Sequence, residues 1–345
     1  MTQAPRRIVV RLPNWLGDGV MAVPALRALR RRFPVAEFVL FGRGVFEPLL
    51  SESGLYDRFL PRGGKSSETD AVTALRDLDA DLAIIFPHSF RSALEPWRAA
   101  IPMRIGYARE GRTRLLSHSI SVHRRGRDIA PVPMHYQYLE LVGICGATGT
   151  PMDGDLAAGP EAEERADEWL ALRGIDRRTR PLGLNPGASF GPSKIYPPEL
   201  LAAAADRAVR AGHGPLLILC GPGEEGLARE VEDALQSPCA SAADDPPPLD
   251  VLKGILLRLS ALVTTDSGPR HLATALGVPT VVVMGPTDPR FTAARLERSA
   301  ILRRDVPCGP CHERFCPLDH RCMREIAPDD VAAALDQLLA TVAAV

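Results

Sequence analysis

One pattern constrains the fold of this chain more than any other: short β-branched and apolar runs that end in a turn and lead into an amphipathic stretch. Residues 8–12 form the first run and predict a strand. Residues 19–32 follow with apolar side chains at steps of three and four, which predicts a helix. Residues 38–41 and 82–86 predict two more strands. Strands that alternate with helices build parallel sheets, so we expect an α/β fold.

The alternation begins again near Pro181. Four further strands are expected at residues 182–184, 215–220, 261–265 and 280–284, with helices at 198–211, 224–236, 249–260 and 268–276. The segment between the two series, 146–159, is small, polar and turn-forming. We therefore expect two similar α/β domains, at residues 1–160 and 161–345. The last amphipathic stretch, 329–342, predicts a helix that docks on a core, and its spacing leaves open which domain it joins.

The overall composition excludes several classes of protein. Of 345 residues, 46% are hydrophobic and 24% are charged, which is typical of globular chains and not of disordered or membrane-embedded ones. The 41 basic and 42 acidic residues leave a net charge of -1, so an anionic partner must bind a local patch, and nucleic acid is not expected. No run approaches the ~20 apolar residues of a spanning helix, and no secretory signal is found, so we expect a cytoplasmic protein.

The turn after the expected strand at 261–265 is the first candidate binding site. In open α/β sheets, ligands bind outside the carboxyl ends of strands, where helix N-termini present N–H groups to anions. Here the sequence is TTDSGPRH, in which serine and glycine let a phosphate approach the backbone. The candidate residues are Thr265, Asp266, Ser267, Gly268 and His271. The alternative is that Asp266 or Ser267 only caps the helix, which leaves His271 unexplained.

Two more turns follow strands of the same half. The first, NPGASFGPSK, supplies hydrogen-bond donors and one positive charge through Asn185, Ser189 and Lys194, which suits a diphosphate. It lacks the Gly-Lys-Ser/Thr order of an ATPase P-loop, and taken alone it also fits an ordinary surface loop. The second, CGPGEE, offers Glu224 as a carboxylate for ribose hydroxyls. Together the three turns predict a nucleotide-diphosphate site in the C-terminal half.

The N-terminal half carries one such turn, NWLGDGVMA at residues 14–22. The sequence GDGVMA matches the G-x-G-x-x-A pattern of dinucleotide-binding proteins, which keeps a nicotinamide-dependent oxidoreductase as an alternative function. Two features weaken that match: residues 13–16 separate the glycines from the strand, and Glu37 falls at the start of the second strand instead of its end. Asp18 is then either a general base that takes a proton from an attacking hydroxyl or a helix N-cap.

Arginines recur between residues 88 and 116, with Trp97 and Tyr107 among them. Such clusters usually form solvated faces, but guanidinium groups that converge on a cleft suit a phosphorylated sugar or an anionic membrane surface. Candidate acceptor-binding residues are Asn14, Trp15, Arg91 and Arg104.

Four of the seven cysteines lie within fifteen residues: Cys308, Cys311, Cys316 and Cys322. They could hold zinc or an iron–sulfur cluster, form two disulfides, or remain free thiols, and their spacing fits no standard site. No cofactor is therefore firmly expected, and both a structural metal and an assisting divalent cation are left open.

Several segments, in this order, resemble glycosyltransferase family 9, the ADP-heptose:lipopolysaccharide heptosyltransferases: RLPNWLGDGVMAVPALRALRRRFP, FPHSFRSALEPWRAAIPMRIGY, GLNPGASFGPSKIYP and TTDSGPRHLATALGVPTVVVMGPTDPRFT. The resemblance runs from about residue 7 to the C-terminus. It is strongest to heptosyltransferase II, with heptosyltransferases I and III as alternatives. It implies a GT-B fold, in which two Rossmann-like, doubly wound parallel-sheet domains flank a cleft. It also implies transfer of L-glycero-D-manno-heptose, with inversion, from ADP-heptose to the inner core of lipopolysaccharide.

The resemblance implies roles for individual residues as well. Asp18 matches the catalytic base of the family, and Lys194 matches the lysine that stabilises the departing ADP phosphate. The residues that match those binding the diphosphate and the heptose are Asp266, Ser267, Gly268 and His271. The chain departs from the family where Lys-Arg-Trp-Pro is common, because residues 194–197 read KIYP. The N-terminal domain is thus expected to bind the acceptor and the C-terminal domain the ADP-sugar, with peripheral contact to the inner membrane.

Overall fold

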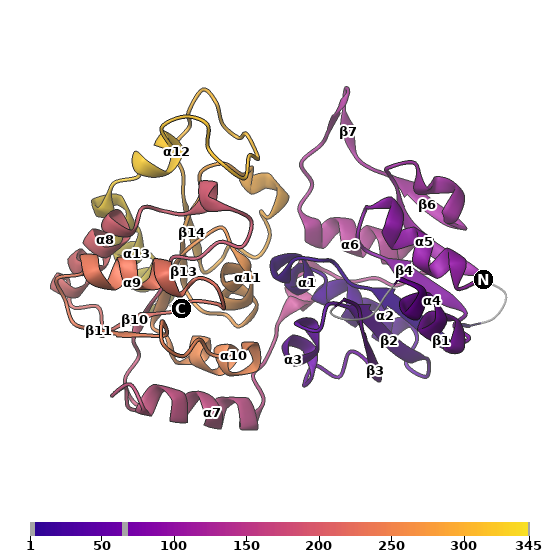
Figure 1. Ribbon diagram of the computed structural model, residues 1–345, viewed down its shortest axis with the longest axis horizontal. Helices are drawn as coiled ribbons and strands as arrows, with labels where there is room; N and C mark the ends of the chain where they lie inside the picture. The colour runs from indigo at the N-terminus through magenta and orange to yellow at the C-terminus, as the bar shows by residue number, and fades with distance from the viewer. Residues whose placement is uncertain (1–3, 64–67, 344–345) are drawn as a thin grey trace. The chain divides into compact units, whose positions relative to one another are not determined.

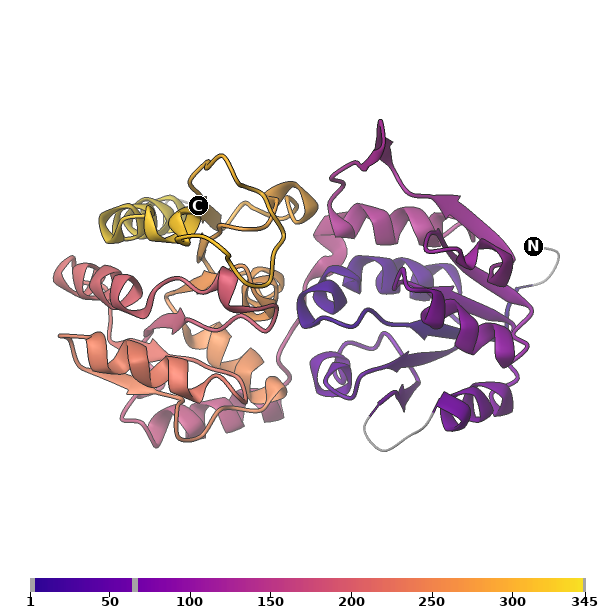
Figure 2. The same cartoon turned by 45° about the horizontal axis from the view of Figure 1, so that its top comes forward.

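The computed structural model describes residues 4–63 and 68–343. The chain divides into two compact units. The first comprises Met1–Asp155 together with Arg290–Ala294, and the second comprises Leu156–Pro289 together with Arg295–Val345. Figures 1 and 2 show helices on both faces of the sheet in each unit. None of the helices in the described part of the chain is long and apolar enough to cross a membrane.

The first unit is built on a six-stranded parallel sheet in the order β3-β2-β1-β4-β5-β6. Its strands are β1 (Arg7–Arg11), β2 (Glu37–Gly42), β3 (Arg58–Pro61), β4 (Leu82–Ile85), β5 (Met103–Ala108) and β6 (His118–Ser121). Its helices are α1 (Leu16–Met21), α2 (Val23–Arg32), α3 (Phe46–Leu50), α4 (Glu68–Asp77), α5 (Phe90–Arg98) and α6 (Met134–Gly143). A small antiparallel hairpin, β7 (Arg124–Arg125) and β8 (Asp128–Ile129), precedes α6.

The second unit repeats this plan, with six parallel strands in the order β11-β10-β9-β12-β13-β14. The strands are β9 (Leu182–Asn185), β10 (Leu216–Ile218), β11 (Cys239–Ser241), β12 (Ala261–Thr265), β13 (Thr280–Val283) and β14 (Ser299–Leu302). The helices are α7 (Pro160–Ala171), α8 (Pro198–Arg210), α9 (Glu225–Ala234), α10 (Leu249–Arg258), α11 (Gly268–Ala275), α12 (Arg321–Arg324) and α13 (Pro328–Ala343). The final helix α13 packs against α8, β13 and β14, so it belongs to the core of this unit, a point that its sequence left open.

Each sheet has one point where the strand order reverses, and this point positions the candidate sites. In the first sheet it lies between β1 and β4, and in the second between β9 and β12. The connections that follow the two central strands run to opposite sides of such a point. The loops at the carboxyl ends of these strands therefore diverge, and the crevice between them binds ligands. The prediction of an α/β fold with two doubly wound parallel sheets is confirmed.

The predicted helix at 19–32 is wrong in detail. The structure has two helices there, α1 and α2, which meet at Ala22, and α1 begins at Leu16. Pro24 lies at the start of α2, because its ring cannot continue a helix but suits a first turn. Gly19 within α1 permits a close approach to Phe46, since a Cβ at this glycine would lie 2.1 Å from the Phe46 ring.

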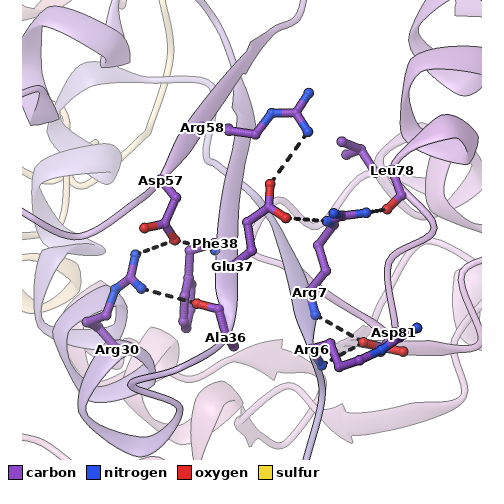
Figure 3. Close-up of polar contacts among 10 residues, drawn as sticks. All are labelled: Arg6, Arg7, Arg30, Ala36, Glu37, Phe38, Asp57, Arg58, Leu78 and Asp81. Atoms are coloured by element: carbon purple, nitrogen blue, oxygen red, sulfur yellow. Dashed lines mark hydrogen bonds and ion pairs between the residues drawn. The ribbon is translucent and has the colours of Figure 1, made fainter.

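Ion pairs join the strands at the amino edge of the first sheet (Figure 3). Arg7 Nε lies 2.6 Å from Glu37 Oε2, and Arg58 Nη1 lies 3.5 Å from Glu37 Oε1. Asp81 Oδ2 accepts hydrogen bonds from the backbone N–H groups of Arg6 and Arg7, at 2.7 and 3.0 Å. Glu37 is thus a partner of two arginines at the edge opposite the carboxyl ends of the strands. A ribose-binding carboxylate would be needed at the other edge, which counts against the nicotinamide alternative.

The contact between α7 and α10 depends on Gly254. A Cβ at this position would lie 2.6 Å from the Cβ of Ala166 and 2.7 Å from the carbonyl oxygen of Ala162. Replacing Gly254 with Ala is therefore expected to destabilise the protein by about 1–3 kcal/mol through overpacking. Gly226→Ala in α9, where no atom lies within 4 Å of the added methyl group, is the matched control. It should gain about 0.5–1 kcal/mol from helix propensity. Urea unfolding of both variants measures the difference, and equal stabilities would contradict this account of the contact.

Candidate active site

The loops that follow β9, β10, β12 and β13 meet at the carboxyl edge of the second sheet. Asn185 at the end of β9 donates from Nδ2 to Thr264 Oγ1 at 3.1 Å and to Ser267 Oγ at 3.3 Å. Thr265 Oγ1 donates to the carbonyl oxygen of Gly187 at 2.8 Å. These bonds tie the loop after β9 to the turn after β12, across the point where the strand order reverses. Two of the three turns predicted from the sequence therefore lie side by side.

Asp266 is the centre of the polar contacts at this edge. Its carboxylate oxygen Oδ2 lies 2.7 Å from Lys194 Nζ and accepts a hydrogen bond from Thr287 Oγ1 at 2.7 Å. Its other oxygen, Oδ1, pairs with Arg270 one helical turn further along. Lys194 Nζ also donates to the Asp266 carbonyl oxygen at 2.9 Å, and the Phe190 ring lies 5.0 Å from the same nitrogen. The lysine is thus held in one place by contacts with two residues.

The electrostatic balance of this cluster favours an anionic ligand. Burial by itself would raise the pKa of Asp266, but the cations Arg270 and Lys194, with His271, hold it well below its usual range. Asp266 is therefore ionised, and its single negative charge faces two basic side chains, Lys194 and Arg270. The cluster therefore has one more basic than acidic side chain. It lies beside the N-terminus of α11, where backbone N–H groups favour binding of a phosphate.

The helix-cap alternative is not what the structure shows. Ser267 occupies the N-cap position of α11, but its side chain makes no capping hydrogen bond. The Asp266 carboxylate is used by Lys194, Arg270 and Thr287 instead. Gly268 is the first residue of α11, and His271, half-buried, follows one turn later. The Ser267 side chain therefore accepts no hydrogen bond from the backbone N–H groups at the start of α11.

Glu224 belongs to the third predicted turn, after β10, and lies against the loop after β9. A Cβ added to Gly187 would be 2.1 Å from Glu224 Oε2, so the glycine leaves room for this carboxylate. Glu224 Oε2 accepts a hydrogen bond from the Gly221 N–H at 3.0 Å. Burial raises the pKa of Glu224, and the neighbouring Glu225 adds to the rise. Ser189, by contrast, is exposed in the same loop.

In the first unit, Asp18 lies beside the other point of strand reversal. It is the third residue of α1, whose N-cap position is taken by Trp15, so Asp18 is not the N-cap. It lines two neighbouring cavities, of 230 and 170 Å³, that share Asp18, His88 and Met134. The smaller cavity is also lined by Asn14 and Trp15. A carboxylate in the wall of a cavity at the carboxyl end of a strand has the placement that a general base requires.

The two arginines predicted to bind an acceptor line neither cavity. Arg91 in α5 is exposed and pairs with Glu68 of α4 at 3.0 Å. Arg104 in β5 donates from Nε to the carbonyl oxygen of Leu115 at 2.7 Å, and its Nη1 bonds two further main-chain carbonyls. The donors of Arg104 therefore hold neighbouring backbone in place, which is a structural use.

Of the alternatives open for the four clustered cysteines, the structure shows free thiols and not two disulfides. Cys308 and Cys311 are exposed, Cys316 is partly buried and Cys322 is buried, and none is in a disulfide. Burial raises the pKa of Cys322 to about 11, with smaller contributions from the other three thiols. In the part of the chain that the structure describes, no three His, Cys, Asp or Glu side chains are grouped to bind a metal ion. These cysteines have no part in the chemistry proposed below.

Two residues of the second-unit site were not predicted from the sequence. Arg270 is buried and pairs with Asp266, and the only signal for it is the four-residue spacing of opposite charges on one helix. Thr287 reaches Asp266 from the loop after β13, twenty-one residues away, and no local pattern marks it.

Comparison with known proteins agrees with this geometry. The sequence model of glycosyltransferase family 9 (heptosyltransferase) matches residues 70–321 of this chain. Lipopolysaccharide heptosyltransferase 2 of Escherichia coli (strain K12) is 29% identical, over 96% of this chain and 98% of its own. Lipooligosaccharide heptosyltransferase 2 of Campylobacter jejuni is 26% identical, over 96% and 98% of the two chains.

Among solved structures, the E. coli ADP-heptose LPS heptosyltransferase II superimposes with a TM-score of 0.79. It is 26% identical, and the match covers 98% of this chain and 99% of that one. This chain therefore belongs to glycosyltransferase family 9, the heptosyltransferases, and its two parallel-sheet α/β units are those of the GT-B fold.

Proposed function

We propose that this chain is an inverting heptosyltransferase that moves L-glycero-D-manno-heptose from ADP-heptose to the inner core of lipopolysaccharide. The proposal is supported by the cluster of Lys194, Asp266 and Arg270 at the N-terminus of α11, which offers a site for the diphosphate of an anionic donor. Asp18, in a cavity wall at the corresponding place in the first unit, supplies the base.

The proposed reaction is a single displacement. The Asp18 carboxylate accepts the proton of the acceptor hydroxyl while the hydroxyl oxygen forms a bond to the anomeric carbon of the heptose. The bond from that carbon to the ADP oxygen breaks, and its electron pair leaves with the diphosphate. Lys194 Nζ and the backbone N–H groups at the start of α11 stabilise the negative charge that develops on the leaving group. Attack and departure on opposite faces invert the anomeric centre.

The remaining residues of the second-unit site are assigned to donor binding. Asn185, Thr265 and Thr287 hold the loops around Asp266 in place through the hydrogen bonds described above. Asp266 fixes the position of the Lys194 ammonium group, and Glu224 is suited to accept hydrogen bonds from the ribose hydroxyls. In this assignment Lys194 touches the phosphate, and Asp266 acts through Lys194 and Arg270.

We further propose that the acceptor is reached at the cytoplasmic face of the inner membrane. The hairpin β7–β8, which projects from the first unit in Figure 1, carries the exposed residues Arg124, Arg125 and Arg127. Each exposed arginine near an anionic lipid surface contributes about 1 kcal/mol of attraction, so three of them favour peripheral contact.

A transfer assay tests the proposed function. ADP-heptose is supplied with truncated core acceptors that differ by one heptose, and the product is followed by mass spectrometry. We expect one heptose to be added, with release of ADP, and we expect heptosyltransferase II specificity to appear as a preference for the acceptor that already carries a heptose. Binding of NAD(P)H without any heptosyl transfer would instead support the oxidoreductase alternative.

A further inference from the structure

The main chain around His88 is clamped by a buried arginine. His88 follows β4, and Arg112, which is fully buried, donates from Nη1 to the carbonyl oxygens of Pro87 and Ser89 on either side of it. The same nitrogen donates to Ser92 Oγ at 2.8 Å, and Arg112 Nε donates to the carbonyl oxygen of Tyr107 at 2.9 Å. The loop after β4 is therefore fixed to the end of β5, the neighbouring strand.

The His88 ring is fixed as firmly as its backbone. Arg109 Nη1 lies 3.1 Å from His88 Nδ1, and the Tyr107 ring contacts the imidazole edge-on with centroids 5.2 Å apart. A guanidinium group can only donate a hydrogen bond, so Nδ1 must accept it. The proton of the neutral ring is then on Nε2, and the tautomer is set by Arg109.

His88 Nε2 is buried and has no hydrogen-bond partner among the residues that the structure describes. Buried N–H groups in folded proteins are nearly always paired, and an exception calls for a ligand or another specific cause. His88 lines both cavities that Asp18 lines. The unpaired Nε2–H group of His88 therefore belongs to a residue that lines the same cavities as Asp18, the base proposed to deprotonate the acceptor.

The surroundings of His88 keep its ring uncharged. Burial, and then the cations Arg109 and Arg112, lower the pKa of His88 to about 4. The other titratable groups around these cavities are Asp18, which lines both, His123 in the larger, Tyr138 in the smaller, and Tyr107, whose hydroxyl donates to Glu140. A neutral imidazole leaves the negative charge of Asp18 available to the acceptor proton, whereas an imidazolium ion would compete for it.

We propose that His88 is an acceptor-binding residue: its Nε2–H donates a hydrogen bond to an oxygen of the acceptor sugar other than the attacking one, and so holds that sugar beside Asp18. Arg109 is a positioning residue that acts through the imidazole ring. The ligand class is a polyhydroxylated sugar, recognised through a lone pair of a hydroxyl or ring oxygen. This inference rests on the proposed function for the identity of the acceptor and goes beyond it in assigning the residue and the atom.

Steady-state kinetics with two substitutions at His88 provide the first test. His88→Met fills the space without a donor, and its KM for the acceptor is expected to rise about tenfold, with the KM for ADP-heptose unchanged. His88→Gln places an amide N–H close to the position of Nε2 and is expected to stay within about threefold of the unmodified protein. His118→Met, at an exposed histidine of the same unit, is the control and should change neither KM.

Proton NMR of the full chain provides the second test. In the absence of substrates, the His88 ring proton is expected to titrate near pH 4, and Arg109→Met should raise this midpoint towards the ordinary histidine value of about 6.5. The acidic limb of kcat/KM for the acceptor should move to higher pH with it, because a protonated ring stabilises the Asp18 carboxylate and so makes it a weaker base. Arg109→Lys retains a cationic donor, so it should shift the His88 midpoint and the acidic limb of kcat/KM less than Arg109→Met does.

The outcomes separate the two proposals. If the unmodified chain transfers heptose but His88→Met leaves the acceptor KM unchanged, the role of His88 is wrong and the proposed function stands. A His88 midpoint near 6.5 in the unmodified chain would contradict the account of how Arg109 and burial keep the ring neutral. If the unmodified chain transfers no heptose to any core acceptor, the proposed function fails, and the role of His88 fails with it.

Discussion

Replacing Asp18 with Asn is expected to lower the rate of heptosyl transfer by about 10²–10⁴-fold, because the amide cannot accept the proton of the attacking hydroxyl. The shape of the side chain is retained, so the cavities that Asp18 lines should keep their form. Loss of a negative charge from the first turn of α1 should cost only about 0.3–1 kcal/mol of stability. The affinity for ADP, which the second unit is proposed to bind, should be unchanged.

Three measurements decide this prediction: kcat of transfer, ADP affinity by calorimetry, and the free energy of unfolding. Asp77→Asn, at an exposed aspartate at the end of α4, is the matched control and should behave as the unmodified protein. A fall in transfer accompanied by an equal loss of ADP binding and several kcal/mol of stability would show that Asp18 is a structural residue and not the base.

Replacing Lys194 with Met is expected to lower kcat by about 10²–10³-fold, the range seen when one preorganised donor to a developing charge is removed. The Lys194 ammonium group is the cation proposed to meet the leaving diphosphate, and it is held 2.7 Å from Asp266 Oδ2. The fold should survive, since Asp266 keeps its contacts with Arg270 and Thr287. Arg178→Met, at an exposed position of the same unit, removes the same charge and should leave kcat unchanged.

A double variant separates the two roles open to Lys194. If the lysine serves only to neutralise Asp266, then Asp266→Asn combined with Lys194→Met removes both charges and should restore transfer. If the lysine contacts the phosphate, the double variant should remain slow and bind ADP more weakly than the unmodified protein. We expect the second result, because Arg270 already provides Asp266 with a buried counter-charge.

The central strands of both sheets were predictable, and the edge strands were not. β1, β4, β9, β12 and β13 are buried on both faces and therefore appear in the sequence as continuous apolar runs. The strands that were not predicted, β3, β5, β6, β11 and β14, lie at or beside the sheet edges and are partly exposed. Their residues have no strong apolar pattern, because only part of each strand contacts the core.

The turns with chemical function were predictable for a related reason. A turn at the carboxyl end of a buried parallel strand has a known place in the sheet, so polar residues in it must lie at the ligand-binding edge. Asp18, Lys194 and Asp266 were identified on this basis together with the family resemblance, and their catalytic and binding roles stay predictions. Arg91 and Arg104 were chosen for their charge alone, and charge does not say whether a side chain faces a cavity, another helix or main-chain carbonyls.

The two doubly wound units and the turns that carry Asp18, Lys194 and Asp266 follow from local sequence patterns, because hydrophobic periodicity and turn residues act over a few neighbouring positions. Which side chains from different strands meet depends on how the strands and helices of those units pack. Arg270 and Thr287 converge on Asp266, and Arg109 fixes the ring of His88, because the order of strands brings distant loops together at one edge. Strand order depends on how whole helices and sheets pack, and no local pattern records it.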